Sequence, residues 1–412
     1  MGKKKILYYT DCPFFAGCEN MIANFFNSEE LSKVYDIVLV YRYSKRYEEG
    51  AKMRMNLDKA IPVKLVVEPD SVDIVKSENK VISTIQKIYW FLLLWITKYY
   101  SIPRNAKVLT RVFREINPDI IHINNGGYPA ATSCFAAVKA ARGCGVKHVV
   151  YMVNNMAMDY SHPLRWFDRG LDSVVKKTVS YFITGSNNAG KRLEEAIAVS
   201  TEKRRVIRNG ITPRKATMTT SSFKKLYNIP EDKLVFSEIA NLEERKGHRV
   251  LLQAIKKLRE GGKIDNVHFV LEGTGPLKTE IEAYIQNNQL EDIVSLIQVK
   301  AIYDLYQATD VLILPSIHTE DFPNTIIEAM GQGIPAIGTR IAGIPEQIID
   351  YQNGLLIDPS DVDQLATAIK EMADDNELRE SCSRNSKETF ERNYTAEISV
   401  RNYSELYKSF YK

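Results

Sequence analysis

The sequence of 412 residues lacks the cysteine and histidine patterns that mark several classes of protein. Its five cysteines are odd in number and scattered, and none has zinc-like spacing with a histidine partner: Cys12, Cys18, Cys134, Cys144 and Cys382. This pattern argues against a disulfide framework or a zinc module and predicts free thiols in a reducing compartment. No acidic pair resembles a metal site either, since the cluster Asp361–Asp363 is typical of a helix start.

Long hydrophobic runs are absent as well. The basic segment Met1–Lys5 is followed by Ile6–Tyr9, an apolar stretch too short for the core of a signal peptide, which predicts a first strand. The apolar run Ile88–Ile96 is far too short to span a bilayer. No internal repeat and no nucleic-acid-binding motif is evident. We therefore expect a cytoplasmic protein that does not bind nucleic acid.

The composition and length of the sequence are typical of a globular protein with two domains. Hydrophobic residues make up 44% and charged residues 26%, and the length allows two separate cores. The net charge of +4 conceals an asymmetry, because residues 1–205 hold 31 Lys and Arg against 20 Asp and Glu, whereas residues 206–412 hold 24 against 31. Either two solvated surfaces differ in charge, or the basic first half faces an anionic membrane or a phosphate-bearing acceptor.

Apolar runs alternate with helical stretches in both halves, which predicts the α/β class with parallel sheets. The Asn209-Gly210 turn and Thr212-Pro213 indicate the crossing between the domains. We expect strands in the first half at 5–9, 36–41, 120–123, 148–153 and 181–185. In the second half we expect them at 206–208, 234–240, 267–272, 294–297, 310–314 and 335–338.

Residues 81–100 form a stretch rich in aromatic side chains that allows two interpretations. It contains Trp90, Trp95, Tyr99 and Tyr100, with Lys87 and Lys98 beside them. Such a segment is either a buried core helix or a helix that lies in a membrane interface. The second interpretation predicts reversible attachment to a membrane surface.

The segment Ser316–Thr339 contains two glutamates, Glu320 and Glu328, separated by seven residues. An apolar run predicts a buried strand before it, and Gly331 and Gly333 are placed as helix stop signals. Glu320 is therefore expected on a loop at the carboxyl end of a strand, with Glu328 one turn into the next helix. The helix N-terminus offers backbone amides to an anion, while carboxylates accept from sugar hydroxyls. The pattern is typical of a nucleotide-sugar site.

Around these glutamates the sequence resembles the retaining glycosyltransferases of the GT-B fold, family four, also called glycosyl transferases group 1. The resemblance rests on the glutamate pair, on Glu328-Ala-Met330, on Gly333-Ile-Pro335 and on Gly343-Ile-Pro-Glu346. It implies two Rossmann-like doubly wound domains facing a central cleft. The implied domains are residues 1–205 for the acceptor, residues 206–390 for the donor, and a last helix, residues 391–412, that crosses back to the N-terminal domain.

The resemblance also implies site residues in the second half. Glu320 would act in catalysis by holding the sugar, Glu328 would bind the ribose, and Lys246 would neutralise the donor diphosphate. Asn241 stands where the family has an arginine, so Arg245 or another cation is expected to compensate. Further expected donor contacts are the segment Asp321, Phe322, Pro323, Asn324 and Thr325, together with Gln298 and Val299 for the base.

In the first half the matching positions are fewer. Gly17 and Glu19 match the family's Gly-Gly-x-Glu turn, whereas Ala16 departs from it. Asn154 stands where the family has a histidine that touches the donor sugar, and an amide can still hydrogen-bond a hydroxyl. His122 is expected to be a satisfied core histidine, and His318 is a candidate ligand contact because it lies two residues before Glu320.

The implied function is retaining transfer of a sugar from a nucleoside diphosphate, UDP being favoured, to a hydroxyl acceptor. The expected acceptor is a lipid-linked saccharide of bacterial surface polysaccharide assembly, at the inner face of the cell membrane. GT-B enzymes use cations and a helix N-terminus where GT-A enzymes use a metal, so neither a metal nor a cofactor is expected. Two alternatives stay open, a catalytically silent sugar-binding subunit and a GT-B-fold nucleotide-sugar epimerase.

Overall fold

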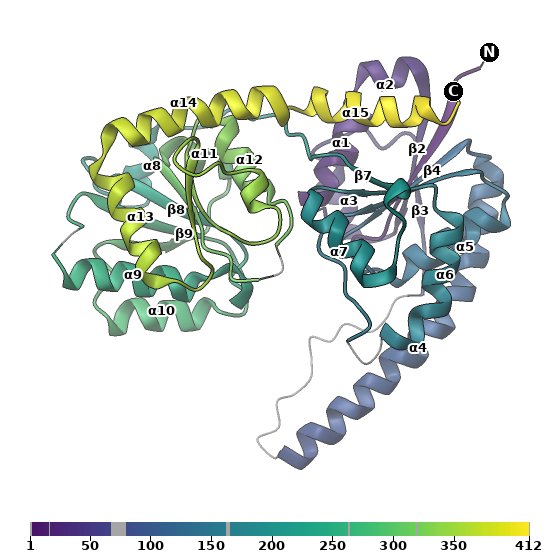
Figure 1. Ribbon diagram of the computed structural model, residues 1–412, viewed down its shortest axis with the longest axis horizontal. Coiled ribbons are helices and arrows are strands. Elements are labelled where there is room, and N and C mark those ends of the chain that lie inside the picture. The colour runs from purple at the N-terminus through teal and green to yellow at the C-terminus, as the bar shows by residue number, and fades with distance from the viewer. Residues whose placement is uncertain are drawn as a thin grey trace. The chain divides into compact units, whose positions relative to one another are not determined.

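The computed structural model describes residues 2–15, 17–66, 80–161, 165–262, 264–318 and 320–411. The chain forms two compact units (Figure 1). Unit 1 comprises Met1–Thr184, Gly190–Ile207 and Asn402–Lys412, and unit 2 comprises Gly185–Ala189 and Arg208–Arg401. Each unit therefore contains at least one segment that is remote in sequence from the rest of it.

Unit 1 is built on a parallel sheet of seven strands in the order β3-β2-β1-β4-β5-β6-β7. The strands are β1 (Lys4–Thr10), β2 (Tyr35–Arg42), β3 (Ala60–Val63), β4 (Ile120–Asn125), β5 (His148–Val153), β6 (Tyr181–Thr184) and β7 (Arg204–Val206). The strand order reverses between β1 and β4, which pair in parallel with Tyr8 opposite His122. This doubly wound arrangement is Rossmann-like and has its topological switch point at β1/β4.

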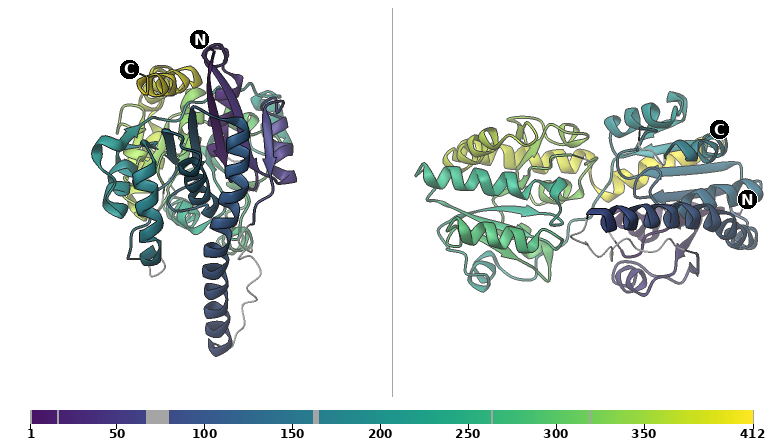
Figure 2. Two further views of the ribbon diagram at one scale, coloured as in Figure 1. Left: turned by 90° about the vertical axis from the view of Figure 1, so that its right-hand side faces the viewer. Right: turned by 90° about the horizontal axis from the view of Figure 1, so that it is seen from below.

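The helices of unit 1 cover both faces of this sheet (Figure 2). They are α1 (Asn20–Asn27), α2 (Glu29–Val34), α3 (Lys45–Lys52), α4 (Lys80–Ile116), α5 (Thr132–Gly143), α6 (Arg169–Thr178) and α7 (Asn187–Ile197), with short turns η1 (Gly17–Glu19), η3 (Arg165–Asp168) and η4 (Thr201–Lys203). The C-terminal part of α4 supplies Leu109 and Phe113 to the core, where they pack with strand residues such as Ile121.

The C-terminal tail completes unit 1. Helix α15 (Ala396–Ser409) carries Tyr403 and Tyr407, both fully buried, and unit 1 includes the chain from Asn402 onward. The Tyr407 hydroxyl is hydrogen-bonded to the Tyr8 hydroxyl and lies 2.7 Å from Nδ1 of His122. Burial lowers the pKa of His122 to about 3. His122 is thus a satisfied core histidine, as the sequence predicts.

Unit 2 repeats the arrangement with a parallel sheet of six strands in the order β10-β9-β8-β11-β12-β13. The strands are β8 (Leu234–Ile239), β9 (Val267–Glu272), β10 (Val294–Ile297), β11 (Val311–Leu314), β12 (Ala336–Thr339) and β13 (Gly354–Ile357). The helices are α8 (Thr220–Leu226), α9 (His248–Glu260), α10 (Lys278–Asn287), α11 (Ile302–Ala308), α12 (Asn324–Gly331), α13 (Val362–Asp374) and α14 (Asn376–Asn393), with turns η5 (Glu244–Lys246) and η6 (Ile344–Glu346). The switch point of this sheet lies at β8/β11. Asp361 caps α13 by accepting from the Gln364 amide at 2.8 Å, which confirms the predicted helix start.

The strand predictions are wrong at three places. The strand expected at 206–208 is β7, which ends at Val206 and pairs with β6, so it closes the first sheet instead of opening the second. Strand β3 was not predicted because it is a four-residue edge strand that contains Pro62. Strand β13 was not predicted either, since Gly354–Ile357 is too short for a distinct periodic signal.

The aromatic stretch 81–100 lies within α4, which extends away from the sheet of unit 1 in Figures 1 and 2. The side chain of Trp90 lies outside the described residues, as do that of Cys18 and all of Ala16. Trp95 packs at 5.2 Å from Tyr99 and 5.7 Å from Phe167, between ring centroids. None of the helices in the part of the chain that the structure describes is long and apolar enough to cross a membrane. The other four cysteines are free thiols.

Candidate functional site

A group of charged side chains in unit 2 lies at its topological switch point. Lys246 follows β8 on turn η5, and Glu320 follows β11, its neighbour in the sheet. In doubly wound α/β sheets, ligands bind in the crevice outside the carboxyl ends of the strands at this point. Strand order therefore brings together two side chains that are 74 residues apart in sequence.

Glu320 is a buried carboxylate held by two cations. Its Oε2 atom accepts a close hydrogen bond from Nζ of Lys246 and lies 3.2 Å from Nη1 of Arg245. Lys246 and Glu320 are each only 8% exposed. Arg245, which reaches the same oxygen, is thus a second cation beside Glu320. A buried charge that is paired and hydrogen-bonded is tolerated where an isolated one is not.

Gly247 explains why Lys246 can reach this position. Its backbone lies in the left-handed region with φ +85°, and an added Cβ would stand 1.9 Å from the Pro315 carbonyl oxygen. Only glycine allows the turn after β8 to approach the end of β11 so closely. The Lys246-Gly247 dipeptide thus combines a cation with the backbone contact that positions it.

Glu328 lies in α12 and has a different partner. Its Oε2 accepts from the hydroxyl of Tyr306, at 2.9 Å. Tyr306 lies on α11 and is 1% exposed; burial and then the Glu328 charge raise its pKa well above the usual value, so that it stays a donor. Glu328 is half-buried. Tyr306 was not identified from the sequence, because nothing in the pattern of α11 distinguishes it from a core tyrosine.

The turn from Asp321 to Thr325 leads directly into the N-terminus of α12. Ser186 donates to the buried carboxylate of Asp321, whose backbone oxygen accepts from the Gly343 amide at 2.9 Å. Burial, more than any other cause, raises the pKa of Asp321 to about 7. Phe322 packs in the core, and α12 begins after Pro323 with no side-chain cap. The side chains of Asp321 and Phe322 are thus structural, whereas the helix N-terminus is suited to an anion.

The remaining predicted donor contacts of unit 2 lie at the same carboxyl edge. Asn241 and Gln298 are exposed and follow β8 and β10, respectively, and Val299 is half-buried beside them. Glu272, at the end of β9, was not identified from the sequence. Burial raises the pKa of its carboxyl group, although the Val299 amide acts in the opposite direction. The feature of the sequence that could have identified Glu272 as a candidate site residue is its position immediately before Gly273. His318, a candidate contact, is exposed.

Unit 1 carries a second polar group at its own switch point. Glu19 is fully buried and accepts hydrogen bonds from Thr10 at 2.8 Å, Tyr47 at 2.7 Å and Asn124 at 2.9 Å. The Nδ2 atom of Asn154 donates to Oδ1 of Asn124 at 2.7 Å and to the backbone oxygen of residue 125 at 2.8 Å. The predicted Asn154 therefore belongs to a network that reaches Glu19. Gly17, in turn η1, is exposed.

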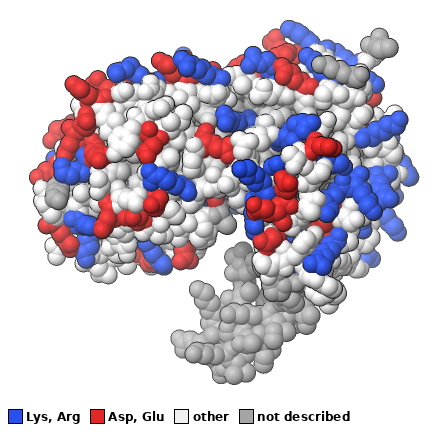
Figure 3. Space-filling view, in the orientation of Figure 1, with Lys and Arg blue, Asp and Glu red and all other residues white. Residues whose placement is uncertain are grey.

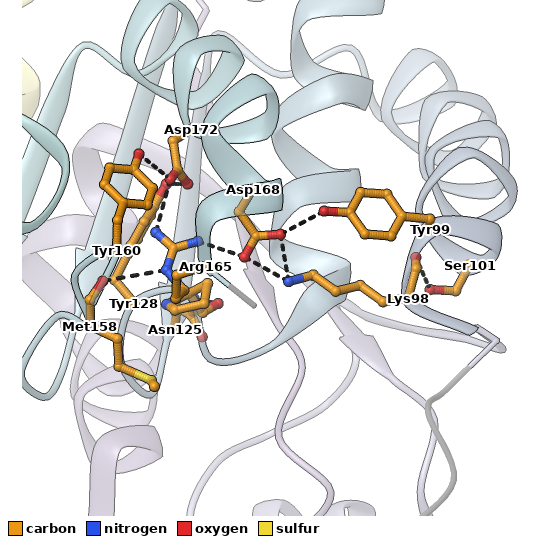
Figure 4. A network of polar contacts seen from close by, with 11 residues as sticks. Lys98, Tyr99, Ser101, Asn125, Tyr128, Met158, Tyr160, Arg165, Asp168 and Asp172 are labelled. Carbon is orange, nitrogen blue, oxygen red and sulfur yellow. Dashed lines mark hydrogen bonds and ion pairs between the residues drawn. The ribbon is translucent and has the colours of Figure 1, made fainter. Parts of the chain in front are cut away.

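An ion network elsewhere in unit 1 is structural (Figure 4). Arg165 pairs with Asp168 at 2.6 Å and with Asp172 at 2.8 Å, and all three are almost fully buried. Lys98 of α4 also contacts Asp168, at 2.8 Å. Because these charges neutralise one another, the network fastens η3 and α6 to α4. Within the described ranges no group of three or more His, Cys, Asp or Glu residues could hold a metal ion.

The fold and these sites define a class: two Rossmann-like units, one with a cation–carboxylate group at its switch point. Two family models match the chain, Glycosyl transferases group 1 over residues 220–389 and Glycosyltransferase Family 4 over residues 60–215. Together they cover most of the chain, and the chain belongs to this family of glycosyltransferases. The resemblance drawn from the glutamate pair is confirmed.

Several curated relatives are similar to parts of the chain. N-acetyl-alpha-D-glucosaminyl L-malate synthase of Bacillus anthracis is 28% identical over 45% of this chain and 48% of its own. The capsular polysaccharide biosynthesis glycosyltransferase CapM of Staphylococcus aureus is 24% identical over 50% of this chain and 54% of its own length. The putative colanic acid biosynthesis glycosyltransferase WcaL of Escherichia coli is 32% identical over 33% of this chain and 35% of its own length. The chain thus spans about half or less of the length of these relatives.

Solved structures match over nearly the whole chain. HepE of Anabaena, in complex with UDP, matches with a TM-score of 0.77 and 17% sequence identity. The match covers 98% of this chain and 100% of the HepE chain. A glycosyltransferase from Rickettsia africae has a TM-score of 0.75 at 18% identity, with both chains covered completely. These likenesses establish the fold, which is the GT-B fold predicted from the sequence.

Proposed function

We propose that this protein is a retaining glycosyltransferase that moves a sugar from a nucleoside diphosphate to a hydroxyl acceptor. The observation that carries the proposal is the group at the β8/β11 switch point, where Glu320 is held by Lys246 and Arg245. Cations placed where charge develops on a leaving diphosphate stabilise the transition state. A carboxylate beside them suits a sugar ring that acquires oxocarbenium-like charge.

The donor is proposed to lie against unit 2. Lys246, Arg245 and the N-terminus of α12 neutralise the diphosphate, Glu328 accepts from the ribose hydroxyls, and Gln298 and Val299 contact the base. In the retaining reaction the bond from the anomeric carbon to the diphosphate breaks. The acceptor oxygen bonds to the same face of the sugar, and its proton moves to the leaving phosphate oxygen. UDP is the favoured nucleotide, which HepE of Anabaena supports because its structure contains UDP.

A nucleotide titration tests the donor assignment. Glu328→Ala is expected to weaken UDP binding by at least about tenfold, or roughly 1.4 kcal/mol, since a charged acceptor is lost. Glu388→Ala, on the exposed surface of α14, is the matched control and should bind like the wild type. Titration calorimetry measures both. Equal UDP affinity in the wild type and in Glu328→Ala would remove the ribose assignment.

Turnover separates this proposal from its two alternatives. Release of UDP from a nucleotide-sugar, with transfer to added acceptor, supports a transferase. Binding of UDP without turnover of any donor would favour a silent sugar-binding subunit, and conversion of one nucleotide-sugar into its epimer without acceptor would favour an epimerase.

The cation pair at the diphosphate position leads us to propose metal-independent transfer. Activity should therefore persist in EDTA, and a strict requirement for Mg²⁺ or Mn²⁺ would contradict this.

The proposed acceptor is a lipid-linked saccharide of bacterial polysaccharide assembly, at the inner face of the membrane. CapM and WcaL support it, since their names place them in polysaccharide biosynthesis. The excess of positive charge in residues 1–205 supports it as well, and Figure 3 shows lysines and arginines spread over the visible face of unit 1. Basic residues near an anionic leaflet contribute about 1 kcal/mol each.

Exposed apolar side chains on two elements of unit 1 are suited to such a membrane. Ile96 and Tyr100 of α4 and Trp166 and Phe167 of η3 are each more than half exposed. Arg104 lies 3.7 Å from the Tyr100 ring centre, and Arg169 lies 5.5 Å from that of Trp166. Exposed aromatic rings beside arginines are typical of side chains at a membrane interface. The Lys98–Asp168 contact joins the two elements that carry these side chains.

Vesicle co-sedimentation tests the membrane proposal. The wild type should bind vesicles containing anionic lipid, more weakly at high salt, and should ignore neutral ones. Trp166→Ser combined with Phe167→Ser should reduce binding at least about threefold. Met53→Ser is the control, because Met53 is 80% exposed elsewhere in unit 1. Absence of binding to both kinds of vesicle, with efficient glycosylation of a soluble acceptor, would overturn it.

A further inference from the structure

One carboxylate oxygen in unit 2 contacts both of the cations that the proposed function assigns to the diphosphate. Oε2 of Glu320 accepts from Nζ of Lys246 and from Nη1 of Arg245, the latter at 3.2 Å. The hydroxyl of Ser316 lies 3.4 Å from the same oxygen. Glu320 and Lys246 are each 8% exposed, so water and salt do little to weaken their attraction. Glu320 is therefore a strong counter-ion for these two cations.

The backbone that carries these side chains is fixed. The backbone oxygen of Arg245 accepts from the Ile317 amide at 2.9 Å, which joins turn η5 to the segment after β11. The backbone oxygen of Ser316 accepts from the Thr339 hydroxyl at 2.7 Å and joins the same segment to β12. A change of partner is therefore left to the side chains. The long stem of a lysine, with three protons on its ammonium group, allows such a change.

The charges of this group balance before a diphosphate is counted. Lys246 and Arg245 each carry a positive charge, and Glu320 and Glu243 each carry a negative one, with Glu243 at 2.8 Å from Nε of Arg245. A diphosphate brings further negative charge and needs the same cations as partners. A cation that turns to phosphate oxygens turns away from Glu320, and a buried carboxylate that loses its cation is destabilised. Diphosphate binding therefore has to overcome the attraction between Glu320 and the cations.

We propose that Glu320 competes with the diphosphate for Lys246 and Arg245, and that this competition promotes release of the nucleoside diphosphate product. This rests on the proposed function and specifies how the same site is regulated. Once the sugar has left, the carboxylate of Glu320 pairs with the two cations again and weakens their attraction to the product. The competition is for charge and not for the base, so it acts on any ligand that contains a diphosphate.

Titration with UDP tests the competition. Glu320→Gln keeps the size of the side chain but not its charge, so Lys246 and Arg245 become available and UDP should bind at least about tenfold more tightly than to the wild type. Uridine has no phosphate and should bind equally to both proteins. Calorimetry measures UDP binding, and ligand-observed NMR measures uridine binding. Unchanged or weaker UDP binding in Glu320→Gln, or an equal gain for uridine, would overturn the proposal.

Glu243→Gln is the matched control for net charge. Glu243 also pairs with Arg245, but its side chain is 39% exposed. Because water and salt weaken an exposed pair, UDP should bind to this variant within about twofold of the wild type. Equal gains in Glu243→Gln and Glu320→Gln would show that total negative charge limits UDP binding, and would overturn the role of the buried pair.

Product inhibition tests the same competition during turnover. The inhibition constant of added UDP should fall at least about tenfold in Glu320→Gln, because the product is held more tightly. The affinity for the intact donor should change less, since this variant also loses the proposed contact between Glu320 and the sugar. An inhibition constant equal to that of the wild type would contradict a role of Glu320 in product release.

A double-mutant cycle tests the pair itself without any nucleotide. Glu320→Gln, Lys246→Met and the double variant are compared with the wild type by denaturant unfolding. The two changes should be coupled by at least about fivefold in the equilibrium constant of unfolding, because each single change leaves a buried charge without its partner. Additive effects would show that Glu320 and Lys246 do not stabilise each other, and would overturn the proposal.

Two outcomes separate this inference from the proposed function. If Glu328→Ala weakens UDP binding while Glu320→Gln binds UDP like the wild type, the inference is overturned and the transferase stands. If neither the wild type nor Glu320→Gln binds UDP, the nucleotide assignment fails and the competition fails with it. The unfolding cycle then still decides whether Glu320 pairs with Lys246.

Discussion

At the scale of single residues, three acidic side chains of one short segment have three different environments. Glu320 is paired with Lys246, Glu328 accepts from Tyr306, and Asp321 is buried against Ser186. The chemical identity of a carboxyl group therefore does not fix its role. Neighbouring charges, hydrogen-bond donors and burial determine whether it stays ionised, and each environment leads to a different expectation.

Replacing Glu320 with glutamine should lower turnover while leaving donor binding less affected. The variant Glu320→Gln keeps the size of the side chain and one oxygen but removes the charge that we propose stabilises the sugar in the transition state. We expect kcat to fall at least about tenfold, or roughly 1.4 kcal/mol of barrier. Steady-state UDP release measures this. Glu243→Gln is the control, because Glu243 is the other carboxylate that pairs with Arg245. Wild-type turnover in Glu320→Gln would contradict the catalytic role proposed for Glu320.

Asp321 should make stability depend on pH. Its pKa is raised from 3.8 to about 7 in the folded protein, so the folded state retains a proton that the unfolded state has lost. Its contribution to stability is complete below pH 3.8 and is lost as the pH rises toward 7. Asp321→Asn stays neutral, so its melting temperature relative to the wild type should rise by roughly 4–8 °C between pH 5 and pH 8.

Thermal unfolding at the two pH values measures this difference. Asp358→Asn is the control, because the Asp358 side chain is 57% exposed and contacts Arg340 at the surface. A constant difference between Asp321→Asn and the wild type at both pH values would show that Asp321 titrates normally.

At the scale of elements, short turns after the strands place the functional side chains. Turn η5 carries Lys246 and Arg245, and the turn into α12 carries Glu320. Turn η1 in unit 1 carries Glu19 in the same way. In each unit the strands hold these turns at the carboxyl edge of the sheet, and in unit 2 the glycine at residue 247 allows turn η5 to approach the Pro315 carbonyl after β11.

Gly247→Ala should destabilise unit 2 strongly. Left-handed backbone alone costs alanine about 1 kcal/mol, and the added Cβ would also collide with the Pro315 oxygen. We expect a total loss above roughly 3 kcal/mol, measured by thermal or denaturant unfolding. Gly262→Ala is the matched control, because Gly262 has φ +60° but open space around its Cβ position. Similar losses in the two variants would show that the contact with Pro315 is not decisive.

At the scale of the whole molecule, each unit depends on a segment from elsewhere in the chain. Residues Gly185–Ala189 belong to unit 2 although the chain around them belongs to unit 1, and Asn402–Lys412 belongs to unit 1. The Glu346 carboxylate accepts from the amides of Asn187 and Asn188 at 3.0 Å each, which fastens the first of these segments. Neither unit is therefore a continuous stretch of sequence.

Tyr407→Ala should destabilise unit 1 although residue 407 lies five residues from the C-terminus. The variant opens a cavity in the core and removes the hydrogen bonds to Tyr8 and His122. Loss of a large buried aromatic side chain costs about 3–5 kcal/mol. Glu405→Ala, at an exposed position of the same helix, should change stability by less than about 0.5 kcal/mol. Thermal unfolding compares the two, and equal stability would show that the tail contributes little to unit 1.

The sequence by itself determined the class of the fold and the identity of several key residues. Alternating apolar runs and helical stretches predicted parallel α/β sheets, because a strand buried on both faces must be continuously apolar. The spacing of Glu320 and Glu328 predicted a loop followed by a helix. In the structure Glu320 lies on the loop after β11, and Glu328 lies in α12. His122 was predicted as a core residue and is buried against Tyr407. The first two conclusions depend on local pattern, and the third depends on the resemblance to the family.

Tertiary structure decided which residues meet. It assigned β7 to the first sheet, placed Arg245 beside Glu320, and set Tyr306 against Glu328. It also connected Asn154 to Glu19 through Asn124, across 135 residues of sequence. The physical reason is that strand order decides which loops share an edge. Sequence pattern specifies that a strand exists, but its neighbours are chosen by packing across the whole sheet.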